Sequence, residues 1–286
     1  MFPHFHKARN PGAEILRVSG LFLTEGLAAL EDPHLGHSDQ LHAARAACKK
    51  ARATLRLLRE AAPGLWRREN ACWRGAARRL AWLREPQALL DAIDDLHARD
   101  QALWGAVDAL RQRVTAPQGK RDASEPARRE AFTRALTRSR ERLAAATPPA
   151  MTRGDLAAAV KHSYRKTRHL RHQLRSRGGK AASSYHDWRK AVKKLGCQCR
   201  LLRREGDECF KRFTAGVDRL GRLLGRDHDL ELLARILRNR DGDVLPKLIH
   251  HRRAALQREA RHCGGQLFAD KIGQFIDRCL PKLSRS

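Results

Sequence analysis

The residues of this sequence best suited to bind a ligand are cations that recur every three or four positions. One row begins at a histidine and consists of His42, Arg45, Lys49, Arg52, Arg56 and Arg59. At about 100° per residue, these positions fall within one sector of a helix, beside an apolar sector that predicts a buried face. Lys50 directly follows Lys49 and adds a cation. Guanidinium and ammonium groups in a row can donate hydrogen bonds to consecutive phosphates, so the pattern predicts a site for a polyanion.

The row occurs a second time at a constant offset of 144 residues. The second copy contains His186, Arg189, Lys190, Lys193, Lys194, Arg200 and Arg203. Apolar positions match at the same offset, so that Cys199 falls on Leu55. Gly196 replaces the residue that matches Arg52, which removes one charge and lowers helix propensity by up to about 1 kcal/mol. Because the polar and apolar patterns agree at one offset, the sequence indicates an internal repeat.

A third basic segment, residues 161–177, contains seven Lys or Arg, three His and no acid. Like charges four residues apart destabilise a helix, so we expect this helix to bind an anion. Its candidate donors are Tyr164, Arg165, Arg168, Arg171 and Arg175. The alternative for each row is an ordinary solvated helix face. His42 and His186 could pack between helices, hydrogen-bond a neighbour as neutral imidazoles, or contact phosphate as imidazolium ions.

The charge of the whole chain also indicates an anionic partner. Its 59 Lys and Arg oppose 31 Asp and Glu, which gives a formal net charge of +28. Nucleic acid, polyphosphate, inositol phosphates and an anionic membrane surface all suit such a surplus. Non-specific DNA or RNA binding is the main alternative, but recognition of bases adds stacking aromatics near the cations. Trp66, Trp73, Trp82 and Trp104 instead have the apolar spacing of core residues.

The sequence predicts an all-α fold, because aromatic residues form only 5% of the chain and apolar positions recur at helical spacing. Helix breaks are expected near Pro33, Pro63, Pro86, Pro117, Pro148, Gly178, Gly206, Gly225, Gly242 and Gly264. We expect one domain over residues 1–286, with repeat one at about 12–147 and repeat two at about 150–284. Charges interrupt each apolar stretch before the roughly 18 residues of a membrane span, and the N-terminus lacks a secretory signal. We therefore expect a soluble, intracellular protein.

These motifs resemble those of the CHAD family, the conserved histidine α-helical domain. The family's His-x-x-Arg-x-x-x-Lys helix occurs twice, beginning at His42 and at His186. Residues 224–230, LGRDHDL, are similar to the family's Leu-Gly-x-x-His-Asp stretch, and residues 164–168 are similar to its Tyr-Arg-x-x-Arg helix. The resemblance covers roughly residues 12–284, and the sequence departs from it at Gly196 and at residues 84–87.

The resemblance implies two four-helix bundles, related by pseudo-twofold symmetry and packed around a basic central groove or pore. It also implies binding of inorganic polyphosphate, and in some members association with polyphosphate granules in bacteria. We therefore expect a cytoplasmic, non-catalytic protein that binds polyphosphate and associates with polyphosphate granules, and whose groove is lined by the cations named above. No cofactor and no metal are expected. A scaffold that tethers a partner protein to an anionic granule is a further hypothesis.

Catalytic and metal motifs give weaker alternatives. The sequence contains neither a GxxxxGK[ST] loop nor an HExxH segment. Asp227, His228 and Asp229 could form an acid–base or metal site, but after Gly225 they fit the first turn of a helix better. Cys197 and Cys199 would point to different faces of a helix, so we interpret them as buried thiols rather than metal ligands.

Overall fold

In the part of the chain that it describes, the computed structural model consists of helices and the connections between them, without strands, which confirms the predicted all-α class. The described residues are 3, 5–6, 10–80, 86–97, 111–112, 114, 125–176, 182–202, 208–237, 244–271 and 273–275. Within these ranges the described side chains are all except those of residues 86–88, 91, 95, 97, 175–176, 182–183, 236 and 244. Among these residues, no helix is both long and apolar enough to cross a membrane.

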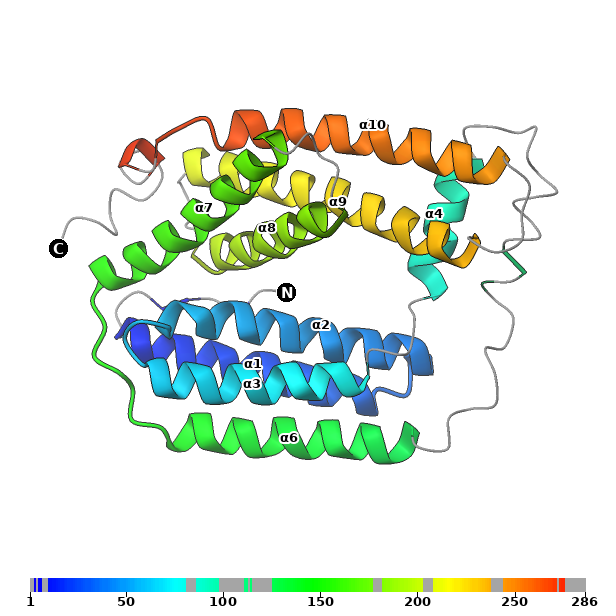
Figure 1. The fold of residues 1–286 in the computed structure, drawn as a ribbon. Coiled ribbons are helices and arrows are strands. Elements are labelled where there is room, and N and C mark those ends of the chain that lie inside the picture. Colours follow the sequence, from blue (N-terminus) through cyan, green and yellow to red (C-terminus); the bar gives the residue numbers. More distant parts are fainter. Residues whose placement is uncertain are drawn as a thin grey trace.

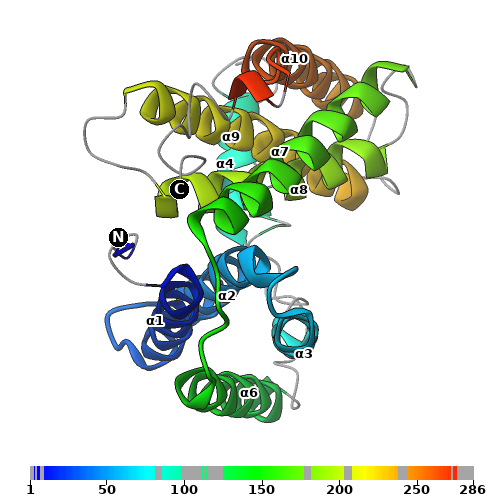
Figure 2. The ribbon, with the colours of Figure 1, turned by 90° about the vertical axis from the view of Figure 1, so that its left-hand side faces the viewer.

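The first group of helices comes from the first repeat and forms a four-helix bundle (Figures 1 and 2). It consists of α1 (Pro11–Glu31), α2 (His37–Leu55), α3 (Pro63–Arg79) and α6 (Glu125–Ala145). A short 3-10 helix, η1 (Arg56–Leu58), continues α2 by one turn. In the end view of Figure 2 the four helices lie at the corners of a square, and each packs against two neighbours. Their apolar faces meet around the fully buried side chains of Phe22, Trp73 and Phe132.

The second group consists of α7 (Arg153–Ser176), α8 (Ala182–Leu202), α9 (Glu208–Leu237) and α10 (Val244–Leu267). Its core includes Trp188, Phe210 and Phe268. Helix α4 (Pro86–His97) lies in the first repeat of the sequence, yet it packs against α9 and α10 of the second group. The two groups contact each other through α2 with α8 and through η1 with α7 (Figure 1). The pseudo-twofold relation between them stays a prediction.

Prolines begin three helices, two of them at the predicted breaks Pro63 and Pro86, because a missing N–H costs nothing in the first turn. Helices α1, α3 and α4 begin at Pro11, Pro63 and Pro86, and the Asn10 side chain caps α1 by accepting from Gly12 N at 2.7 Å. The break predicted at Gly225 is wrong, because α9 continues to Leu237. Packing of α9 against both α8 and α10 outweighs the propensity cost of about 1 kcal/mol for one internal glycine.

The break predicted at Gly264 and Gly265 is also wrong, because both lie inside α10. Gly264 makes room for a neighbouring side chain. A Cβ atom at Gly264 would lie 2.7 Å from Cζ2 of Trp188, whose side chain is fully buried. The packing of the Trp188 ring of α8 against α10 therefore requires a residue without a side chain at this position.

Each group contains a buried carboxylate that joins two helices. Glu69 of α3 is fully buried and accepts two hydrogen bonds from Arg142 of α6, both at 2.8 Å. Asp227 of α9 is 2% exposed and accepts from Arg253 and Gln257 of α10, each at 3.0 Å. Asp227 thus lies in a helix interior, and its interpretation as part of a helix N-terminus is wrong.

Substitution of Gly264 and Gly225 by alanine tests the packing of α10 and α9. We expect Gly264→Ala to lower the free energy of unfolding by about 1–3 kcal/mol, because the new methyl group collides with a ring that has no room to move. Gly225→Ala should raise it by up to about 1 kcal/mol, since a Cβ there meets no atom within 4 Å. Urea unfolding followed by circular dichroism measures both, and equal effects of the two variants would contradict this account.

Candidate functional site

The contact between α2 and α8 brings cations from several helices together. Gln198 of α8 donates to the carbonyl oxygen of Ala53 in α2 at 3.0 Å, so the two backbones lie close. Along one edge of this contact lies a group that we call the central basic cluster. It consists of Arg52, Arg56, Arg59, His162, Lys166 and Lys194. These residues come from α2 and η1, from α7, and from α8.

Lys194 is the centre of the central basic cluster. Its side chain is half-buried, and burial lowers the pKa of the ammonium group to about 8, helped by the charges of Arg56, Arg52, Lys166 and Arg59. Among the described residues, no carboxylate forms an ion pair with Lys194. A half-buried ammonium group that is surrounded by guanidinium groups is electrostatically unfavourable until an anion arrives.

The arginines of the cluster have the same character. Burial lowers the pKa of Arg52 and of Arg56, and neighbouring arginines lower each further. Arg52 donates from Nε to the amide oxygen of Asn70 in α3 at 3.1 Å, a neutral partner that leaves its charge uncompensated. Within the described part of the chain, the acid paired to the cluster is Glu60, which is 82% exposed and lies 3.3 Å from Arg59 Nε. An exposed pair of this kind contributes little.

Trp66 of α3 holds two of these arginines in place. The guanidinium carbons of Arg56 and Arg59 lie 5.8 and 5.5 Å from the centre of its ring, which is within cation–π range. The sequence predicted Trp66 to be a core residue, but it is only partly buried. A signal was available: a connection as short as residues 59–62 makes consecutive helices antiparallel neighbours, which places the start of α3 beside the end of η1.

His162 and Lys166 of α7 complete the cluster. The Nη1 atom of Arg59 lies 3.4 Å from Nε2 of His162, a distance at which the unprotonated nitrogen can accept. Burial and then the charges of Arg56 and Arg59 lower the pKa of His162, so the ring is neutral at pH 7. Neither residue was among the predicted site residues, although both lie in the basic segment that the sequence singled out.

The first predicted row divides into two parts. Arg52, Arg56 and Arg59 join the central basic cluster, whereas His42 and Lys49 are exposed nearer the start of α2, with Arg45 half-buried between them. Lys50 lies away from the cluster and forms an ion pair with Glu25 of α1 at 2.5 Å.

The second row lies mainly on the side of α8 that faces α9, and Lys194 is its contribution to the central basic cluster. Arg189 and Lys193 lie close enough to His228 of α9 to lower its pKa. Lys190 pairs with Asp187 at 3.3 Å, and Arg200 pairs with Asp218 of α9 at 2.7 Å. Arg203 lies outside the described residues, as do Arg84 and Glu85 of the segment that departs from the family pattern.

The third segment forms α7, but Tyr164 does not face a ligand. Its ring is fully buried and stacks on Phe275 with 4.3 Å between ring centres, and its hydroxyl donates to the carbonyl oxygen of Asp270 at 3.1 Å. We therefore correct this prediction: Tyr164 is a core residue. Arg168 donates to the carbonyl oxygen of Phe268 at 3.2 Å, Arg165 is exposed and Arg171 is half-buried. The side chain of Arg175 lies outside the described residues.

His186 and His228 form a pair between α8 and α9. Their ring centres lie 4.9 Å apart. Burial lowers the pKa of His228 to about 4, and burial and nearby cations also lower the pKa of His186. Both rings are therefore neutral at pH 7, which favours the helix-packing interpretation of His186 over direct contact with phosphate as an imidazolium ion.

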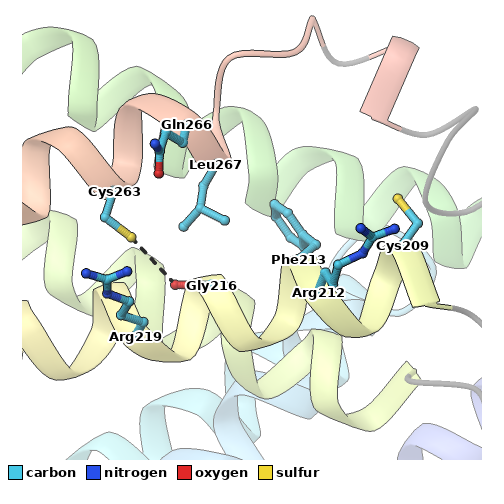
Figure 3. Close-up of a pocket in the computed structure, with 8 residues that line it drawn as sticks. All are labelled: Cys209, Arg212, Phe213, Gly216, Arg219, Cys263, Gln266 and Leu267. Atoms are coloured by element: carbon cyan, nitrogen blue, oxygen red, sulfur yellow. Dashed lines mark hydrogen bonds between the residues drawn. The ribbon is translucent and has the colours of Figure 1, made fainter.

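Neither the cysteines nor a hollow in the second group forms a second chemical centre among the described residues. Cys197 and Cys199 are buried in α8, and no three His, Cys, Asp or Glu side chains among the described residues lie together in a way that could hold a metal ion. A hollow of about 420 Å³ lies between α9 and α10 and is lined by Cys209, Arg212, Phe213, Gly216, Arg219, Cys263, Gln266 and Leu267 (Figure 3). Arg219 is paired with Glu259 at 2.9 Å, and the lining contains no residue of α2 or α8.

Comparison with known families agrees with this architecture. The model of the CHAD domain matches residues 23–238, a range that includes α2, α8 and the whole central basic cluster. CHAD domains are associated with polyphosphate binding and metabolism. Searches of curated proteins and of solved structures found no match to this chain. With a family match over most of its length, the chain belongs to the CHAD domain family.

Proposed function

We propose that this protein binds inorganic polyphosphate without chemical turnover, and that the central basic cluster is the binding site. The observation that carries the proposal is Lys194, a half-buried cation with three arginines and a lysine around it and, among the described residues, no acid paired to it. Such an arrangement lowers the free energy of unfolding of the ligand-free protein. A chain of phosphates removes that cost, because each phosphate can accept from neighbouring cations.

The composition of the cluster favours binding over catalysis. Its groups are guanidinium, ammonium, imidazole and amide groups, which hold phosphate oxygens, and among the described residues no buried carboxylate lies near the cations to act as a general base. Association with polyphosphate granules is part of the proposal, because a surface that binds the polymer also binds the granule that stores it.

The position of Trp66 favours polyphosphate over nucleic acid. Non-specific single-strand binding gains about 1–3 kcal/mol for each base that stacks on an aromatic ring. In the part of the chain that the structure describes, Trp66 is the aromatic ring at the cluster, and the guanidinium groups of Arg56 and Arg59 already lie against it. Polyphosphate has no bases, so the occupied Trp66 ring does not lower its binding free energy. A nucleic acid cannot stack a base on this ring and therefore loses that contribution to binding.

A salt series separates the two candidate ligands. We expect long-chain polyphosphate to stay bound at salt concentrations at which DNA and RNA have dissociated, across about 50 to 500 mM. Fluorescence anisotropy of labelled polymers in competition measures this. If the three polymers dissociate at the same salt concentration, the surface is a generic cationic one and nucleic acid becomes the working ligand.

Charge reversal tests the cluster. We expect Arg56→Glu with Lys194→Glu to weaken polyphosphate binding by about a hundredfold or more, since a charge-assisted hydrogen bond contributes about 1.5–3 kcal/mol. The control is Arg138→Glu with Arg140→Glu, which makes the same change of charge on exposed residues of α6, away from the α2–α8 contact. Equal losses in both variants would refute the cluster as the site.

Removal of the Lys194 charge should separate stability from binding. Lys194→Met keeps most of the side-chain length, and we expect it to raise the free energy of unfolding at pH 7 by about 1–2 kcal/mol while it weakens polyphosphate binding. A variant that is both less stable and unchanged in affinity would contradict the assignment.

The pH dependence follows from the same residue. The pKa of Lys194 in the folded protein, about 8, lies below its unfolded value, so its contribution to folding stability falls as pH decreases through 8. Binding has the opposite sign, because phosphate needs the charged form. We expect polyphosphate affinity to fall as pH rises from 7 to 9, and titration calorimetry should show that this decrease is smaller in Lys194→Met.

A further inference from the structure

The internal repeat produces cations on both edges of the α2–α8 contact, but the two edges differ in their acids. On the edge opposite the central basic cluster, Lys50 Nζ lies 2.5 Å from Glu25 of α1, and Arg200 Nη1 lies 2.7 Å from Asp218 of α9. We call these four residues the paired edge. They form a balanced set, with two positive and two negative charges.

The two sets are separated by the packed contact itself. Lys50 and Arg52 are two residues apart on α2, so their side chains leave the helix in directions that differ by about 200°. The electrostatic surroundings agree. The charges of Arg200, Lys50 and Asp218 shift the pKa of Cys197 in α8, whereas those of Arg56, Arg52, Lys166 and Arg59 shift the pKa of Lys194. These two sets of described charged residues do not overlap.

Gly196 accounts for part of the difference in acidic residues between the two edges. It occupies the position that repeats Arg52, and a Cβ atom there would lie 3.2 Å from Oδ1 of Asp218 and 3.3 Å from Val217. The missing side chain lets α9 approach α8. Where the first repeat places a guanidinium group, the second repeat therefore places a carboxylate from a neighbouring helix.

We propose that Glu25 and Asp218 are specificity determinants that confine a polyanion to the central basic cluster and exclude it from the paired edge. This inference rests on the proposed polyphosphate binding. Each carboxylate already occupies donors of its cation, and each would repel phosphate oxygens that approach the same donors. One molecule consequently holds one polyphosphate chain at the α2–α8 contact, although its sequence repeat supplies cations for two.

The test removes the two negative charges and leaves the shapes of the side chains. We expect Glu25→Gln with Asp218→Asn to bind a second chain of a short polyphosphate of defined length, seen as an increased stoichiometry in titration calorimetry. Trp66 fluorescence reports the central basic cluster, so its change should be complete before the second chain has bound; the variant Trp66→Phe identifies that signal. The control is Glu130→Gln with Glu259→Gln, which removes the same charge from exposed ion pairs with Arg134 and Arg219.

The outcomes are distinct. A double variant whose stoichiometry and affinity equal those of the control overturns the inference, because the gain then reflects net charge alone. Each single variant provides a second measurement, with a weaker second binding event expected for either. Absence of polyphosphate binding by the unaltered protein would overturn the proposed function itself, independently of Glu25 and Asp218.

Discussion

The close contact between two positively charged helices is the constraint on which the rest of this structure depends. Helices α2 and α8 meet through small or uncharged groups, with Gln198 donating to the Ala53 carbonyl and the Cys197 thiol to that of Lys50 at 3.7 Å. Their cations therefore lie along the edges of the contact, where burial strengthens their mutual repulsion. The depressed pKa of Lys194 is the clearest consequence.

The remaining helices offset that repulsion. The buried Glu69 with Arg142 joins α3 to α6, and the buried Asp227 with Arg253 joins α9 to α10, so these two carboxylates hold neighbouring helices together. Large apolar side chains such as Trp73 and Trp188 provide the burial that stabilises each group. Among the described residues, the positions of Glu25, Glu60 and Asp218 decide which cations at the α2–α8 contact have an acidic partner.

Binding and stability are coupled in such an arrangement. A site whose charges repel one another destabilises the free protein. A ligand that neutralises these charges removes the repulsion, and this contributes to the binding free energy and stabilises the fold. The edge occupied by Glu25 and Asp218 shows the alternative solution, in which the protein supplies its own anions. On one edge of the contact the cations are thus paired with carboxylates of the protein, and on the other edge the central basic cluster is predominantly positive.

The helical class and the family were predictable from the sequence alone, because both depend on spacing along the chain, as do the two cationic rows that predict an internal repeat. The packing of the helices, rather than any pattern in the sequence, makes Tyr164 a core residue, continues α9 through Asp227 and brings Trp66 against two arginines. It also decided which cations are neutralised, since the partners of Lys50 and Arg200 belong to other helices. Charge compensation depends on distances between helices, and spacing within one helix carries no information about them.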